Sequence, residues 1–168
     1  MTPSGPGEPV RPPNSPVALH HRPAFVALVL AGGILGTLAR YGVSLAVPAT
    51  GGWPLPTLLV NLGGSFLLGV LLESLVFPRN AGRADVLRLG AGTGFLGAFT
   101  TYSAFAFEAV SLLGAGRPAL AAVYVALSLV GGIACAAAGV AAASWWRGNE
   151  PDVSSPDGRT AAGPEQAQ

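Results

Sequence analysis

Charged residues are scarce in this sequence: they make up 10% of its 168 residues, whereas 51% are hydrophobic. Lysine is absent, and the nine arginines are scattered, which excludes the clustered basic surface of a nucleic-acid-binding protein. The single cysteine, Cys135, can form neither an internal disulfide nor a cysteine-based metal site. Since a soluble domain of this size cannot bury so much apolar surface, the composition favours a membrane protein.

The apolar part of the chain also lacks the residue constellations of enzymes. Both histidines, His20 and His21, precede the first apolar segment. No apolar segment holds a pair of carboxylates or a nucleophile beside a base. The phosphate-binding motif G-x-x-x-x-G-K-[ST] does not occur either. We therefore expect neither an enzyme nor a pump driven by ATP.

Four apolar segments fill the middle of the chain, each long enough to cross a bilayer as a helix. They cover residues 24–47, 55–77, 86–113 and 118–146, and loops rich in proline or glycine separate them. The sequence therefore predicts an all-α membrane protein with four transmembrane helices, in a four-helix transmembrane domain of residues 24–147. The polar stretches 1–23 and 148–168 are predicted to be disordered tails, and the first has no apolar core of a signal peptide.

The arginines predict how the chain is oriented. With four spans, both tails and the loop between the second and third spans share one side of the membrane. That side holds most of the arginines, so the positive-inside rule places both termini in the cytoplasm.

Several polar residues fall inside the predicted spans. Asn61 lies in the second span, and Tyr124 and Ser128 lie four residues apart on one face of the fourth. Such groups either bond between helices or line a polar path. Arg40 and Glu108 are ionisable, and such side chains usually face the bundle interior or a water-filled cavity, unless they reach an interface.

The most informative stretch is GAFTTYSAFAFE, residues 97–108, in the middle of a third segment that is longer than a span needs. Its run Thr100–Ser103 favours local side-chain bonding over a regular helix, so we predict a helix break there. A break at membrane depth requires protein or a wet cavity around it, and its free carbonyls can coordinate a cation. Neutral donors together with the electropositive edges of phenylalanine rings suit a small anion.

Three motifs occur in order on the first three spans: GGILGTLARY, TLLVNLGGSFLLG and GTGFLGAFTTYSAFAFE. With the fourth span, they resemble the Fluc/CrcB family of bacterial fluoride channels over residues 32–139. The resemblance implies a passive fluoride-selective channel in the bacterial plasma membrane, which exports cytoplasmic fluoride and relieves its toxicity. It also implies a dual-topology dimer of antiparallel subunits, with two pores and one structural sodium ion (Na+) at the interface.

The resemblance also implies roles for individual residues. By motif position, Asn61 is the amide that contacts fluoride, and Phe105 is the second ring of the family's phenylalanine box. Gly97 and Thr100 supply backbone carbonyls to sodium, and Arg40 lies near a pore mouth or has a structural role. The remaining residues implied at the break or along the pore are Thr101, Ser103, Glu108, Tyr124 and Ser128.

One position departs from the family pattern: the first ring of the box, usually phenylalanine, is Tyr102 here. A tyrosine keeps the electropositive ring edge and adds a hydroxyl donor, so we expect transport to persist. The arginine bias raises a second question, because a dual-topology homodimer requires insertion both ways. We therefore hypothesise that the chain pairs as a heterodimer with an oppositely oriented paralogue, and a homodimer is the alternative.

Two other functions are compatible with four short spans. A small proton-coupled multidrug exporter requires a carboxylate within the membrane, for which Glu108 is the only candidate. A structural membrane protein without transport is the other alternative. It predicts that substitution of Asn61 or Phe105 harms stability alone.

Overall fold

A computed structural model describes residues 23–48, 52–76 and 81–149 of the chain. These residues form helices α1 (Pro23–Ala46), α2 (Leu55–Ser74), α3 (Ala81–Val86), η2 (Leu87–Leu96), α4 (Gly97–Phe99), α5 (Tyr102–Gly114) and α6 (Pro118–Gly148). No strand occurs among them. The pieces α3 to α5 follow one another as a single span, so the predicted fold of four membrane-spanning helices is confirmed. The predicted tails lie almost wholly outside the described residues.

The helix boundaries differ slightly from the predicted ones. The second helix ends at Ser74 instead of residue 77, and the third span begins at Ala81, five residues earlier than expected. Prolines in the first turns of α2 and α6 fix the backbone dihedral that a helix start requires. Gly116 makes the tight turn between α5 and α6, with a φ of 70° that favours glycine.

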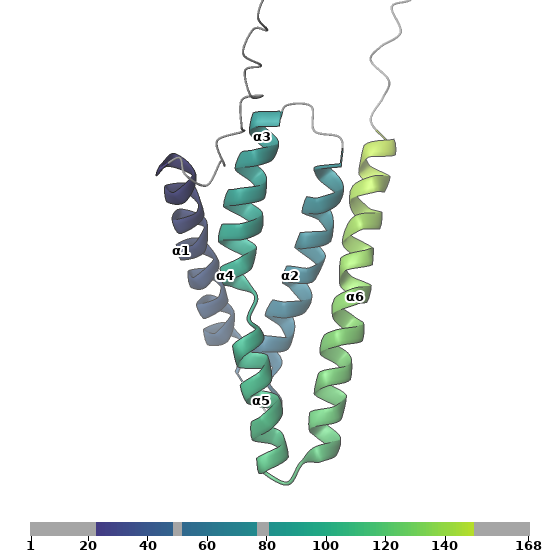
Figure 1. The fold of residues 1–168 in the computed structure, drawn as a ribbon. Helices are drawn as coiled ribbons and strands as arrows, with labels where there is room; N and C mark the ends of the chain where they lie inside the picture. Colours follow the sequence, from purple (N-terminus) through teal and green to yellow (C-terminus); the bar gives the residue numbers. More distant parts are fainter. Residues whose placement is uncertain (1–22, 49–51, 77–80, 150–168) are drawn as a thin grey trace, which may run out of the picture.

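The spans alternate in direction (Figure 1). The start of α1, the end of α2, the start of α3 and the end of α6 lie at one end of the bundle. Arg83 and Arg147 belong to helix ends on this side, and Arg117 precedes α6 at the opposite end. Both ends of the described chain therefore lie on one side, as expected. The assignment of that side to the cytoplasm stays a prediction.

Two helix pairs account for most of the packing: α2 with α6, and α1 with η2. Each pair approaches closely through glycine. A methyl group at Gly139 of α6 would overlap the backbone carbonyl of Phe66 in α2, and one at Gly36 of α1 would overlap that of Phe95 in η2. Small residues at such crossings are typical of helices packed in a membrane.

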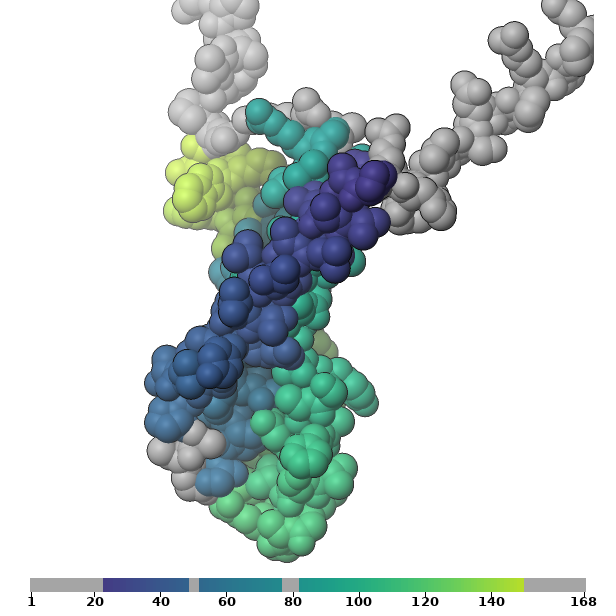
Figure 2. All heavy atoms as spheres, turned by 90° about the vertical axis from the view of Figure 1, so that its left-hand side faces the viewer, coloured from purple at the N-terminus to yellow at the C-terminus, as the bar shows by residue number. Residues whose placement is uncertain are grey.

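Helix α1 crosses one face of the molecule and leaves its outer side uncovered (Figure 2). Its large apolar side chains Leu30, Ile34, Leu38 and Leu45 are all exposed. In the monomer the buried residues are few, with Tyr124 and Val60 the largest that are fully buried among those described. This distribution fits a chain whose surface meets lipid or a second subunit instead of water.

The segment η2 is a π-helix of ten residues, which the sequence analysis did not predict. Its wider turn is visible at its C-terminal end, where the backbone amide of Gly97 donates to the carbonyl of Gly92, five residues earlier. A π-helix this long is rare, and such elements are frequent at functional sites. It leads directly into the helix break.

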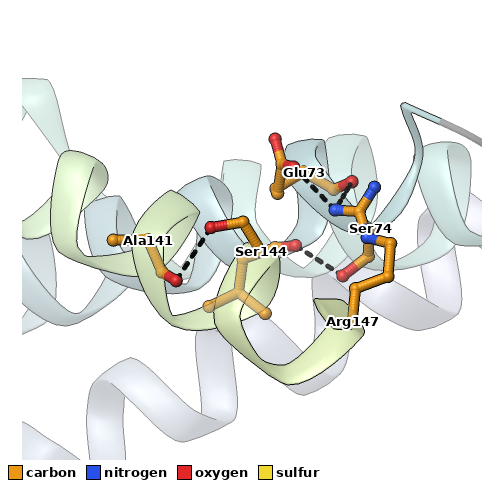
Figure 3. Close-up of polar contacts among 6 residues, drawn as sticks. Glu73, Ser74, Ala141, Ser144 and Arg147 are labelled. Carbon is orange, nitrogen blue, oxygen red and sulfur yellow. Dashed lines mark hydrogen bonds and ion pairs between the residues drawn. The ribbon is translucent and has the colours of Figure 1, made fainter. Parts of the chain in front are cut away.

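An ion pair joins the last turns of α2 and α6 (Figure 3). Arg147 Nη2 donates to the carboxylate of Glu73 (2.6 Å) and also to its backbone carbonyl (2.8 Å), which caps the last turn of α2. The neighbouring hydroxyls of Ser74 and Ser144 donate to carbonyls of their own helices.

Candidate functional site

The third span is broken at Thr100 and Thr101. Thr100 has a ψ of 159° and Thr101 a φ of −149°, so both are extended between α4 and α5. The predicted break is therefore present, but it is shorter than expected: Tyr102 and Ser103 already belong to α5. Thr101 caps that helix, because its hydroxyl accepts a hydrogen bond from the amide of Ala104 (3.2 Å).

Asn61 of α2 holds the break from the side. Its Oδ1 accepts from the amide of Thr101 (2.8 Å), and its Nδ2 donates to the carbonyl of the same residue (3.1 Å). The side-chain amide thus supplies the acceptor that the amide of Thr101 loses where the helix stops. It also adds a second donor to the carbonyl of Thr101, which as the N-cap carbonyl already accepts the first hydrogen bond of α5. Gly64 makes room for this arrangement, because a methyl group there would overlap Thr100 Cγ2.

Glu108 lies about two turns beyond Thr101, and both of its carboxylate oxygens accept hydrogen bonds. Thr57 Oγ1 donates to Oε1 (2.8 Å), and the hydroxyl of Tyr124, a fully buried residue, donates to Oε2 (2.7 Å). Two neutral donors therefore hold the carboxylate in place between α2 and α6. The sequence analysis missed Thr57, although its position four residues before Asn61 places both on one face of α2.

Aromatic rings continue the site along α5. The ring of Phe105 lies between two others: its centroid is 6.0 Å from that of Tyr102 and 5.4 Å from that of Tyr124. Both pairs are tilted, by 46° and 44°. Tilted pairs point the electropositive edge of one ring toward the negative face of another. Tyr102 is 81% exposed, so its outer side has no cover in the monomer.

A cavity of about 430 Å³ opens beside the break. Polar groups and two aromatic rings line its wall: Asn61, Ser65, Thr100, Thr101, Tyr102, Phe105 and Ser128. No charged residue lines it. The hydroxyl of Ser128 is buried and has no hydrogen-bond partner among the described residues, so an unsatisfied polar group lies beside the cavity.

Comparison with known proteins gives a family. A family profile described as CrcB-like protein, Camphor Resistance (CrcB), matches residues 27–140. The chain belongs to the CrcB family. It is 44% identical to "Fluoride-specific ion channel FluC 2" of Geobacillus kaustophilus, over 71% of this chain and 92% of that protein. It is 48% identical to "Fluoride-specific ion channel FluC" of Gloeobacter violaceus, over 69% and 93% respectively.

In this CrcB chain the structure gathers only some of the residues expected at the pore. Asn61, Thr101, Tyr102, Phe105 and Ser128 all line the cavity. The other expected residues take different positions. Glu108 and Tyr124 bond each other, Ser103 is exposed with its hydroxyl 3.3 Å from that of Thr101, and Arg40 lines a separate cavity.

The carbonyls expected to bind sodium, those of Gly97 and Thr100, lie where the helical hydrogen bonds of the third span are interrupted. In an unbroken helix, the amide of Thr101 would bond the carbonyl of Gly97, and that of Ala104 would bond the carbonyl of Thr100. Here these two amides donate to Asn61 Oδ1 and Thr101 Oγ1 instead. Both carbonyls thus lose their helical partners, and such oxygens are the donors that a hard cation prefers. In the described part of the CrcB chain, no cluster of three His, Cys, Asp or Glu offers a metal site.

Proposed function

We propose that this chain is the subunit of a passive, fluoride-selective ion channel in the plasma membrane of a bacterium. The observation that carries the proposal is the cavity at the break, which combines neutral hydrogen-bond donors with an aromatic ring and has no charged lining residue. A full positive charge would hold a small anion too tightly, whereas neutral donors replace part of its water shell and still release it. The names of the relatives support fluoride as that anion.

Three groups act on the ion in this proposal. The hydroxyl of Ser128 has no other partner among the described residues. Asn61 Nδ2 uses one hydrogen on Thr101 and keeps a second for the cavity. Phe105 offers a ring edge, and Tyr102 offers a ring edge and a hydroxyl. An ion moves past these groups by exchanging water for donors and then donors for water.

The direction of flux follows from acid–base chemistry. Hydrogen fluoride is a weak acid that crosses membranes as a neutral molecule and ionises in the more alkaline cytoplasm, where fluoride accumulates. A passive fluoride path lets the anion leave down its own gradient. This chain therefore exports cytoplasmic fluoride without any ATP-binding motif.

The proposed assembly is an antiparallel dual-topology dimer, formed with a second copy or with an oppositely oriented paralogue. The exposed apolar face of α1 supports a partner subunit. We include a structural sodium ion at the dimer interface, held by the carbonyls of Gly97 and Thr100, and supported by the loss of their helical partners. When bound, the ion neutralises the partial negative charge of these carbonyls.

The proton-coupled exporter is less well supported. Its proton site would be Glu108, but both carboxylate oxygens already accept hydrogen bonds from Thr57 and Tyr124. No observation in the described chain points to a site for an organic cation. Loss of drug resistance with intact fluoride resistance on deletion of the gene would favour the exporter over the channel.

The test is fluoride efflux from liposomes that contain the purified chain, measured with a fluoride electrode. Wild-type protein should release fluoride rapidly, and Ser128→Ala and Phe105→Ile should slow the release. Ser144→Ala is the matched control on the same helix, because its exposed hydroxyl bonds only the carbonyl of Ala141. Absence of efflux from folded protein, both alone and with a co-expressed paralogue, would refute the channel.

A further inference from the structure

A second cavity, of about 300 Å³, lies on the other side of the break. It opens between the C-terminal half of α1, the first turns of α2 and the start of α5. Its polar wall comprises Thr37, Arg40 and Ser44 of α1, Thr57 of α2 and Thr101 of the break. Arg40 is the only charged residue that lines it. We call it the Arg40 cavity. It differs from the cavity beside the break, called the pore cavity below, because no charged residue lines the latter.

Arg40 has no partner in the part of the chain that the structure describes: its side chain forms neither a hydrogen bond nor an ion pair there. A guanidinium stays charged and presents five N–H donors. Within a membrane span, such a group is costly unless an anion or water compensates it. Glu108, the acid on α5, bonds Thr57 and Tyr124 and does not bond Arg40.

The two cavities share one residue. Thr101 lines both, and its backbone is the group that Asn61 fixes in place. Thr57 lines the Arg40 cavity, and its hydroxyl donates to Glu108. Thr101 therefore lies between an anion beside Arg40 and the cavity beside the break.

We propose that the Arg40 cavity is a capture site for a small, hydrated inorganic anion, from which the pore cavity is loaded. The inference rests on the proposed channel function. The site concentrates anions through charge, and it does not choose among them, because a guanidinium attracts chloride as well as fluoride. Selection follows in the pore cavity, where only neutral donors replace water. Capture and selection thus fall to different residues.

The first experiment measures initial fluoride efflux from liposomes at two ionic strengths, set with an impermeant organic anion. The Debye length is about 30 Å at about 0.01 M and about 3 Å at about 1 M, so charge capture acts only in the dilute case. Arg40→Gln should reduce efflux about tenfold at low ionic strength, the lower limit of electrostatic focusing in a cleft, and far less at high ionic strength. Arg40→Lys should keep most of the wild-type rate.

The readout is the ratio of the two rates within one preparation, which does not depend on how much protein is active. Arg88→Gln is the control, because it removes the same charge from an exposed residue that lines neither cavity. Its ratio should equal that of the wild type. An unchanged ratio in Arg40→Gln would overturn the capture site.

A second measurement does not require transport. Chloride NMR line broadening reports anion binding to the purified protein, with chloride alone as the probe. Arg40→Gln should remove the excess linewidth. Ser44→Glu, which keeps Arg40 and places a carboxylate in the cavity, should remove it too, and this variant decides if Arg40→Gln does not fold. Broadening that persists in either folded variant contradicts capture at Arg40, whereas normal broadening without fluoride efflux in the wild type refutes the channel instead.

Discussion

The hydrogen bonds of Asn61 make a quantitative prediction about the helix break. Asn61→Ala removes the acceptor of the Thr101 amide and one of the two donors to the Thr101 carbonyl, in a residue that is only 8% exposed. Water cannot easily replace them at that depth. The variant should therefore be destabilised by more than the loss of two ordinary side-chain contacts.

The expected loss of unfolding free energy differs between ordinary hydrogen bonds and a buried backbone group without a partner. Interhelical side-chain hydrogen bonds in membrane proteins average about 0.6 kcal/mol, so two of them account for about 1.2 kcal/mol. A buried backbone group left without a partner costs about 1–3 kcal/mol. Here that group is the amide of Thr101, because the carbonyl keeps its hydrogen bond within α5. With about 0.6 kcal/mol more for the lost donor to the carbonyl, we expect Asn61→Ala to lower the free energy of unfolding by about 1.6–3.6 kcal/mol.

The assay is reversible unfolding in detergent, followed by tryptophan fluorescence, with amide hydrogen exchange at Thr101 as a local readout. Ser65→Ala is the control, because Ser65 lies on the same helix and lines the same cavity without bonding the break. It should unfold like the wild type. A loss of about 1 kcal/mol or less in Asn61→Ala, with unchanged exchange at Thr101, would refute the role of Asn61 as a backbone substitute.

Three further predictions concern the same region. Ser128→Ala should slow fluoride efflux but leave the free energy of unfolding within about 0.5 kcal/mol of wild type, because the hydroxyl has no partner among the described residues. A loss of stability with normal efflux would contradict this prediction. Tyr124→Phe keeps the ring but removes the 2.7 Å hydrogen bond to Glu108, and should cost about 1.5–3 kcal/mol in detergent unfolding; a neutral effect would show that the bond is dispensable. Gly64→Ala should clash with Thr100, cost about 1–3 kcal/mol and speed hydrogen exchange at the break, whereas the open position Gly63→Ala should not.

The four spans and the break could be predicted from the sequence because both are local properties. Span length follows from runs of apolar residues, and the break follows from consecutive threonines that bond their own backbone. The structure bears this out at Thr101, whose hydroxyl caps α5. The break ends earlier than predicted because one capping threonine is enough to restart the helix, so Tyr102 and Ser103 are helical.

The bonds that shape the site could not be predicted, because their partners are distant in the sequence. Asn61 and Thr101 are 40 residues apart, and Thr57 and Glu108 are 51 apart. Sequence patterns identify such polar residues within spans but not which of them bond one another. The π-helix η2 could not be predicted for a related reason. Glycines of η2 pack against α1, and such a tertiary contact overrides the local helical preference of the segment.

The site resolves two requirements that oppose each other. A polar group at membrane depth must be bonded for the fold to be stable, yet a group that binds a passing ion must be free. In the described chain these tasks fall to different atoms. The backbone of Thr101 and the carboxylate of Glu108 are fully partnered, whereas the hydroxyl of Ser128 and one hydrogen of Asn61 are not. Variants of the first kind should therefore lose stability before conduction, and Ser128 variants the reverse, with Asn61 as the one residue whose loss removes both.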